Sequence, residues 1–300
     1  MDQVPVYFLL SLPLVGAFAM FAVGIVVTYQ ASRVLNLAHG AMAMAPPFVV
    51  YEASRLGVPL LPAVALGVAS GAAIGVAVER CFVAVLRKQS STAQTVGTVA
   101  VLGLLVAVAS KIWGTTPRNG VALFPDGGLE VGNSLLRYGQ IGLMAVAVAC
   151  SGLLFALFRS TDLGLAMRAA AQNRRAASLM GVDPDLTARL AWALSGALAA
   201  MGGILLAAIV GLHPYNLALM VLPAFVAALI GGLDRLDGAL VGALVVGLAQ
   251  GMVPATKVIP GLGSLATQVG APQLVLALLA FVVMYVRGER LTGGDVRGAP

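Results

Sequence analysis

Long apolar runs separated by short charged stretches dominate the pattern of this 300-residue chain. A helix that crosses a bilayer needs about 20 mainly apolar residues, within a range of about 17–25. Runs near this length recur nine times, and each predicts a membrane-spanning helix: 6–28, 37–53, 58–78, 93–110, 138–158, 188–209, 218–232, 237–252 and 270–286. Because the second, seventh and eighth runs are short and interrupted by Gly or Pro, eight full spans plus a re-entrant segment are the alternative.

Composition supports this interpretation, since 60% of the residues are hydrophobic and only 10% are charged. An average soluble domain has about 25% charged residues, so a soluble enzyme is excluded. The pattern predicts an all-α, polytopic membrane protein that forms a single transmembrane domain over residues 1–300. The net charge of +6 comes from basic residues spread between apolar runs, which is not typical of a nucleic-acid interface.

The basic residues predict the orientation, because cytoplasmic loops are enriched in Lys and Arg. With the N-terminus outside and the C-terminus inside, 13 basic residues fall on the inner side and 5 on the outer side. The inner residues are Arg33, Arg80, Arg87, Lys88, Arg159, Arg168, Arg174, Arg175, Arg189, Arg235, Arg287, Arg290 and Arg297, and the outer ones are Arg55, Lys111, Arg118, Arg137 and Lys257.

The order of the runs predicts two halves, at about 6–111 and 187–286, each holding four spans. An odd fifth span separates them, so the halves are expected to be inverted relative to each other, as in many transporters. A short echo agrees with this arrangement: Asn36-Leu37-Ala38 and Asn216-Leu217-Ala218 each precede an interrupted apolar segment.

The first polar interruption lies at the start of the second run, where Asn36, His39 and Gly40 stand. Polar groups at membrane depth are costly unless they line a cavity or pair internally. Asn36 is a candidate helix N-cap, and a half-helix N-terminus within the membrane presents free N–H groups to a polar solute. A re-entrant turn packed against neighbouring helices is the alternative.

The longest inner polar segment covers residues 160–186. Thr161 and Asp162 signal a helix start, and Gly181 followed by Pro184 signals its end, so we expect one amphipathic helix over 162–181. Such a helix fits a groove in a cytoplasmic partner, but its arginines equally suit an anionic lipid surface.

The third feature is the stretch 223–239, in which an apolar run ends in Gly231-Gly232. A charged turn follows, and its Asp234, Arg235 and Asp237 are expected to pair locally. Gly238 and Gly242 then form a GxxxG pair, which permits close approach of helix backbones in lipid.

Catalytic patterns are missing from the sequence: it holds no paired carboxylates, nucleophile-plus-base set, phosphate-binding Gly-rich loop or metal-ligand spacing. The chain is therefore not expected to be an enzyme, to bind a cofactor or metal, or to hydrolyse ATP. Energy for active transport would come from a partner or an ion gradient.

Together the three stretches resemble the membrane permease subunits of branched-chain amino-acid ABC importers, the LivH-like family. The family's N-F-A-H-G signature stands here as Asn36 to Gly40, and its coupling segment resembles Gly164–Ala169 with Ala176–Val182. Its late signature resembles Ala224–Ala228 with Gly231-Gly232-Leu233 and Gly238-Ala239. The resemblance covers about residues 14–286.

The resemblance implies an inverted-repeat type II importer fold in the bacterial inner membrane. Its implied partners are a second homologous permease, two cytoplasmic ATPases that bind ATP and Mg²⁺, an extracytoplasmic binding protein and membrane lipid. The implied substrate pathway includes Asn36, His39, Gly40, Asn216 and Phe225. The implied ATPase-coupling residues are Leu165, Arg168, Ala169, Arg175, Ala176, Leu179, Met180 and Gly181.

Ala41, Pro223 and Gln250 depart from the family, which often carries charged residues near these positions. The cargo is therefore a branched-chain amino acid or another small solute such as urea, an amide or a small carboxylate. An autonomous secondary transporter or channel is the alternative function. It would need titratable groups in the membrane, and the candidates Glu52, Glu79 and His39 lie near span ends. A structural subunit without a pathway is a third reading.

Overall fold

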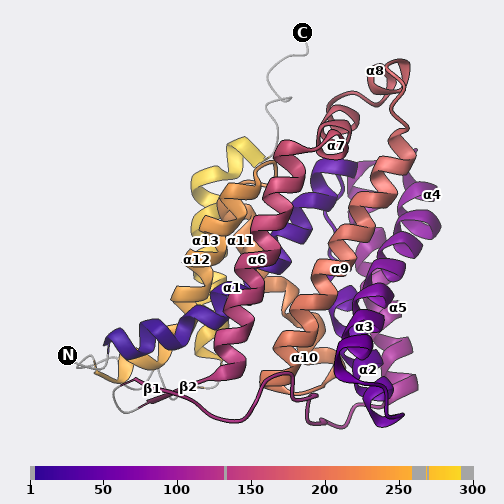
Figure 1. The fold of residues 1–300 in the computed structure, drawn as a ribbon. Helices are drawn as coiled ribbons and strands as arrows, with labels where there is room; N and C mark the ends of the chain where they lie inside the picture. Colours follow the sequence, from indigo (N-terminus) through magenta and orange to yellow (C-terminus); the bar gives the residue numbers. More distant parts are fainter. Residues whose placement is uncertain (1–3, 132–133, 259–267, 269, 292–300) are drawn as a thin grey trace.

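The computed structural model describes residues 4–131, 134–258, 268 and 270–291. Within these residues each predicted apolar run corresponds to a helical segment, which confirms an all-α, polytopic membrane fold (Figure 1). The long segments are α1 (Val4–Ser32), α2 (His39–Arg55), α3 (Leu60–Val78) continued by η1 (Glu79–Val83) and α4 (Ala84–Leu86), α5 (Ser91–Trp113), α6 (Tyr138–Ser160), α9 (Pro184–Val210), α10 (Pro214–Leu219) with α11 (Val221–Gly231), α12 (Leu236–Gly251) and α13 (Ala271–Leu291). The short elements are β1 (Gly128–Val131), β2 (Ser134–Arg137), α7 (Asp162–Gln172), α8 (Arg174–Leu179) and the 3₁₀ helix η2 (Val253–Val258).

The interrupted runs behave differently from one another. α2 continues through Pro46 and Pro47 as one helix, so the two prolines do not divide the second run. The seventh run is divided at Met220, which ends α10 and precedes α11. The antiparallel β1–β2 hairpin was not predicted, because its strands hold only four residues each.

α1 and α9 form the centre of the bundle. Both are long apolar helices whose side chains are mostly buried, whereas only about a quarter of those of α5 and α6 are buried. α1 packs against α6, α9, α11 and α12, and α9 also packs against α2 and α3. The exposed apolar faces of the outer helices suit the hydrocarbon of a bilayer, where apolar side chains need no cover.

Small residues bring the helix backbones together at two crossings. At the α3–α9 crossing, a Cβ atom on Gly71 would lie 2.5 Å from both Ala200 Cβ and the Gly196 carbonyl oxygen. At the α11–α12 crossing, Gly242 packs directly on the backbone of Ala227 and Gly238 on that of Gly231. The close approach predicted for the Gly238/Gly242 pair is therefore confirmed.

Replacing Gly196 by valine is expected to destabilise the α3–α9 crossing by about 1–3 kcal/mol, because the new side chain meets the backbone of Gly71. Thermal unfolding of the purified chain in detergent measures the loss. Gly103→Val is the matched control, since Gly103 lies on α5 with open space around its Cα. Equal unfolding temperatures for the two variants would contradict this packing.

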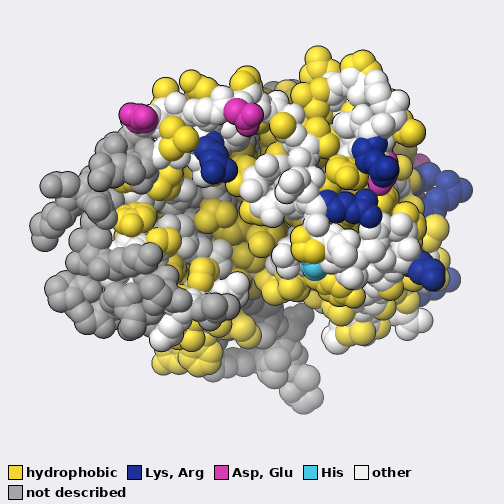
Figure 2. Space-filling model, turned by 90° about the horizontal axis from the view of Figure 1, so that it is seen from below, with side chains coloured by type: hydrophobic (Ala, Val, Ile, Leu, Met, Phe, Trp, Pro, Cys, Tyr) yellow, Lys and Arg dark blue, Asp and Glu magenta, His cyan; other side chains and the backbone are white. Residues whose placement is uncertain are grey.

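The loops predicted to share a side of the membrane lie together. At one end, Arg33 at the end of α1 forms a 2.5 Å ion pair with Asp234, and Arg87 pairs with Asp185. At the opposite end, Arg118 pairs with Glu52 at 3.4 Å and bridges to the backbone of Leu212. In Figure 1 the first end carries α7 and α8 and the second carries β1 and β2. Figure 2 views the second end, where charged side chains are sparse. Arg297 of the predicted inner set lies outside the described residues.

The packing of the second half corresponds to that of the first. α9 packs against α2 and α3, and α1 packs correspondingly against α11 and α12. Likewise α2 packs on α3, and α11 packs on α12. This correspondence matches α1 with α9, α2 with α11 and α3 with α12.

Candidate functional site

The segment that enters α2 is held by the side chains of Asn36 and Thr98 and has no side-chain cap at the start of the helix. Ala38 occupies the N-cap position without a side-chain hydrogen bond, so the predicted capping role of Asn36 is wrong. The fully buried Asn36 instead donates from Nδ2 to Met42 Sδ at 3.5 Å. Thr98 of α5 holds the preceding chain, because its hydroxyl oxygen accepts from the Leu37 N–H at 3.2 Å and lies 3.0 Å from the Leu35 carbonyl oxygen.

His39 begins α2 and is completely buried between α1 and α9. Its Nδ1 lies 3.2 Å from Ser195 Oγ, and that hydroxyl donates to the Gly24 carbonyl at 2.9 Å. A hydroxyl has one proton, so with that proton on the Gly24 carbonyl the contact between Ser195 and His39 needs an N–H at Nδ1 as its donor. Gly24 leaves room for the ring, because a Cβ there would lie 2.5 Å from His39 Cε1. The ring thereby joins the centres of α1 and α9 to the start of α2.

Replacing Ser195 by alanine is expected to destabilise the fold by about 1–3 kcal/mol, because it leaves the buried His39 Nδ1 without its partner, whereas the Gly24 carbonyl keeps the Thr28 hydroxyl. Thermal unfolding in detergent measures the change. The control is Ser70→Ala, whose hydroxyl binds only the Gly67 carbonyl of its own helix. A Ser195 variant as stable as the Ser70 variant would show that the His39 contact contributes nothing.

The predicted pathway residues divide into two groups. Asn36, His39 and Gly40 are adjacent and buried, and Gly40 packs on the Ala218 carbonyl of α10. Gly40, two residues after the first Asn-Leu-Ala echo, therefore contacts the second echo at Ala218. Asn216 is exposed and Phe225 is half-buried.

The predicted helix over 162–181 is two helices, α7 and α8, so the single-helix prediction is wrong. Asn173 divides them: its backbone is extended, and its Oδ1 accepts from the Ala176 N–H at 3.0 Å as the N-cap of α8. The predicted start is confirmed, since Thr161 Oγ1 accepts from the Gly164 N–H at 3.2 Å. The predicted stop is also confirmed, because Gly181 has a φ of +83°, which favours glycine.

Asp183 fixes the exit from this segment into α9. Its Oδ1 accepts from the N–H groups of Leu186 and Asp185, at 3.2 and 2.8 Å. These two donors lower the pKa of the Asp183 carboxyl, because they stabilise its charged form. Pro184 follows in the first helical position, where its missing N–H costs nothing.

The α7–α8 segment exposes apolar side chains at the tip of the molecule. Gly164, Met167 and Ala170 face inward, while Leu179 and Met180 are 81% and 84% exposed. Of the remaining predicted coupling residues, Leu165, Arg168, Arg175, Ala176 and Gly181 are exposed and Ala169 is half-buried. The segment therefore offers a surface beyond the ends of the long helices, visible at the top of Figure 1.

An ion cluster that the sequence did not reveal supports this segment. Arg87 binds both Glu79 and Asp185, and Asp185 also binds Arg174 of α8. The Glu79 side chain is only 2% exposed, in the π-helical turn η1. Arg87 and Asp185 are 98 positions apart, and the other two pairs do not have the spacing of neighbours on one helix face, so only the tertiary fold could show the cluster.

Across residues 4–131, 134–258, 268 and 270–291, no three His, Cys, Asp or Glu side chains come together in a way that could hold a metal ion. The long apolar helices, close glycine crossings and buried polar contacts at a helix break define a multi-pass membrane transport protein.

Comparison with known proteins gives the family. The family described as "Branched-chain amino acid transport system / permease component" matches residues 7–286, so the chain belongs to it. LivH of Methanocaldococcus jannaschii, a probable branched-chain amino acid transport permease protein, is 28% identical over 78% of this chain and 76% of its own length. Two further relatives are high-affinity branched-chain amino acid transport system permease proteins. LivH of Escherichia coli is 26% identical over 79% of this chain and 82% of its own length. BraD of Pseudomonas aeruginosa is 26% identical over 78% of this chain and 81% of its own length. A chain of the solved PsaBC complex from Streptococcus pneumoniae with a Fab covers 95% of this chain and 94% of its own, with a TM-score of 0.47 and 15% identity. The chain is a membrane-spanning permease component.

Proposed function

We propose that this chain is the inner-membrane permease subunit of an ATP-driven importer for branched-chain amino acids or related small polar solutes. Its relatives named LivH and BraD are permeases of branched-chain amino acid transport systems. The match over residues 7–286 is the observation that carries the proposal. A second homologous permease, two cytoplasmic ATPases that bind ATP and Mg²⁺, and an extracytoplasmic binding protein complete the importer.

The end that carries α7 and α8 faces the cytoplasm in this proposal, with the N-terminus outside and the C-terminus inside. The arginine-rich loops that gather at this end support it, because cytoplasmic loops hold an excess of Lys and Arg.

The α7–α8 segment is the docking site of an ATPase subunit. The exposed Leu165, Leu179 and Met180 supply its apolar contacts, and such side chains are suited to a groove in a partner. Asp185 and its two arginines tie the segment to α9 and α4, so movement of the docked helix pair is passed to the bundle.

Cargo passes beside the break that precedes α2 and its counterpart at α10. Asn36, His39, Gly40, Asn216 and Phe225 line or border this path as the transporter changes conformation. α1 packs on α11 and α12 as α9 packs on α2 and α3. This equivalence supports inverted halves at about 6–111 and 187–286. Gln250 is held by the Pro272 carbonyl of α13 at 3.1 Å, and Ala41 and Pro223 are buried.

Affinity purification of the tagged chain from native membranes tests the assembly, with mass spectrometry of the proteins that remain bound. We expect two ATPase subunits and a second permease of the same family. Recovery of the chain with neither, under conditions that keep other membrane complexes intact, would contradict the proposed importer.

A further inference from the structure

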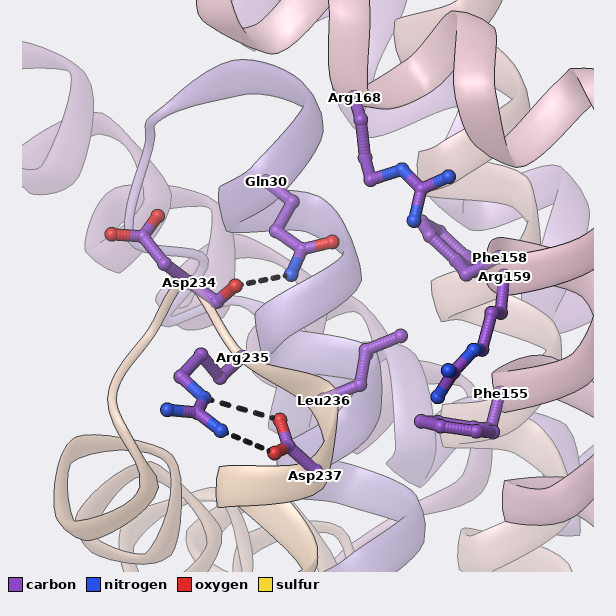
Figure 3. Close-up of a pocket in the computed structure, with 9 residues that line it drawn as sticks. All are labelled: Gln30, Phe155, Phe158, Arg159, Arg168, Asp234, Arg235, Leu236 and Asp237. Atoms are coloured by element: carbon purple, nitrogen blue, oxygen red, sulfur yellow. Dashed lines mark hydrogen bonds and ion pairs between the residues drawn. The ribbon is translucent and has the colours of Figure 1, made fainter.

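Two adjoining cavities lie on the outside of the bundle near its α7–α8 end. The larger, of about 730 Å³, is a groove between α1, α6 and α12, and among its lining residues only Ser151 and Asp237 carry polar side chains. The smaller, of about 360 Å³, lies at the mouth of the groove and is shown in Figure 3. Both cavities are lined by Phe155 and Asp237, so they adjoin at these two side chains.

The groove has the depth of one leaflet of a bilayer. On α6 its lining extends from Phe155 at the mouth to Met144, which is about 16 Å of helix at 1.5 Å per residue. Half of a hydrocarbon core of about 30 Å is about 15 Å. An acyl chain that enters from the α7–α8 surface therefore ends where the groove ends.

The mouth of the groove is positively charged. Figure 3 shows Arg159 and Arg168 on one side of the cavity, opposite Gln30, Asp234 and Arg235. Arg235 binds Asp237 through two nitrogens, and Asp234 is bound by Arg33. Both acidic residues of the mouth are thus neutralised within the protein.

In the part of the chain that the structure describes, Arg159 and Arg168 are the two basic residues of the mouth whose charge is not balanced by a bound carboxylate. Neither has a carboxylate partner among the described residues. Arg159 stacks over the Phe155 ring, 5.7 Å from its centroid, which positions its guanidinium at the boundary between the apolar groove and the charged mouth. Basic pockets between membrane helices bind the head groups of anionic lipids.

We propose that this site binds one anionic phospholipid of the leaflet at the α7–α8 end. Its phosphate is held by Arg159 and Arg168, and one acyl chain lies in the groove between α1, α6 and α12. Since Arg168 belongs to α7 and Arg159 to the end of α6, the lipid head group joins the coupling segment to the membrane-spanning helices. The proposal requires only that the chain spans a membrane, and not the ATPase docking proposed above.

Native mass spectrometry of the purified full-length chain tests the site, with phosphatidylglycerol and phosphatidylcholine of identical acyl chains as probes. We expect the wild-type chain to retain phosphatidylglycerol at least roughly tenfold more tightly than phosphatidylcholine. Glycerol 1-phosphate, which has the phosphate without acyl chains, should bind far more weakly than phosphatidylglycerol.

Two variants separate the head-group and acyl-chain contacts. Replacing Arg159 and Arg168 together by glutamine should remove the preference for phosphatidylglycerol. Gly152→Leu should weaken binding of both lipids, because Gly152 lines the groove and has no protein atom within 4 Å of an added Cβ. The controls are Arg175→Gln, an exposed arginine on α8, and Gly103→Leu, an exposed glycine on α5 with equally open surroundings.

Several results would overturn the proposal. These are equal retention of the two lipids by the wild type, glycerol 1-phosphate binding as tight as phosphatidylglycerol, or loss of the preference in Arg175→Gln as well. A helix of a second permease that crosslinks into the groove at Gly152 of the assembled transporter would assign the groove to a subunit interface instead. Equal size-exclusion profiles for all variants ensure that each result comes from folded protein.

Discussion

The variant with both Leu179→Asp and Met180→Asp is expected to lose ATP-driven transport by roughly a hundredfold or more. Both side chains are more than four-fifths exposed at the tip of the α7–α8 segment, so their replacement leaves the packing of the bundle intact. In a docked complex they would be buried apolar contacts, and loss of two such contacts at about 2 kcal/mol each weakens an interface by this amount or more. Two quantities are measured: the amount of ATPase subunit that stays bound to the purified permease, and the rate of ATP-driven uptake in vesicles.

Leu56→Asp is the matched control for this variant. Leu56 is 83% exposed, but it follows α2 at the opposite end of the molecule. The control should retain the ATPase as the wild type does. If the Leu179/Met180 variant also retains the ATPase at wild-type affinity, the docking surface is not the α7–α8 segment.

Replacing Arg87 by glutamine is expected to cost about 3–5 kcal/mol of stability, which is the largest structural effect we predict. The Glu79 side chain is 2% exposed and Arg87 is its ion-pair partner. Removal of one partner leaves an uncompensated buried charge, which is far more costly than the absence of both. Thermal unfolding of the purified chain in detergent measures the loss.

The double variant Glu79→Gln with Arg87→Gln separates charge burial from other effects of losing the arginine. We expect it to recover most of the stability, because no unpaired charge remains in the buried position. A double variant as unstable as Arg87→Gln alone would indicate that the contact of Arg87 with Asp185, rather than with Glu79, holds this region together.

The sequence predicted the spans well because their signal is local. A run of about 20 apolar residues must form a helix in a bilayer, whatever surrounds it. The break at Met220 and the continuity of α2 through Pro46 and Pro47 were harder to foresee. Both depend on how neighbouring helices satisfy the backbone at those positions.

The sites were predicted less completely, because their chemistry joins distant parts of the chain. The caps at Thr161 and Gly181 follow local rules and were found, whereas Asn173 as the N-cap of α8 was overlooked inside an apparently continuous helical pattern. The contact of His39 with Ser195 spans 156 positions and follows no motif. Asp234 was expected to pair within its own turn, but it pairs with Arg33 instead.

ATP dependence of uptake distinguishes an ATP-driven importer from an autonomous transporter. Proteoliposomes that contain this chain with its co-purifying permease and ATPases, supplied with the binding protein outside, should accumulate radiolabelled leucine only when ATP is enclosed. Liposomes with the chain alone should take up none under a proton or sodium gradient. Gradient-driven uptake by the chain alone would contradict the account and establish an autonomous transporter.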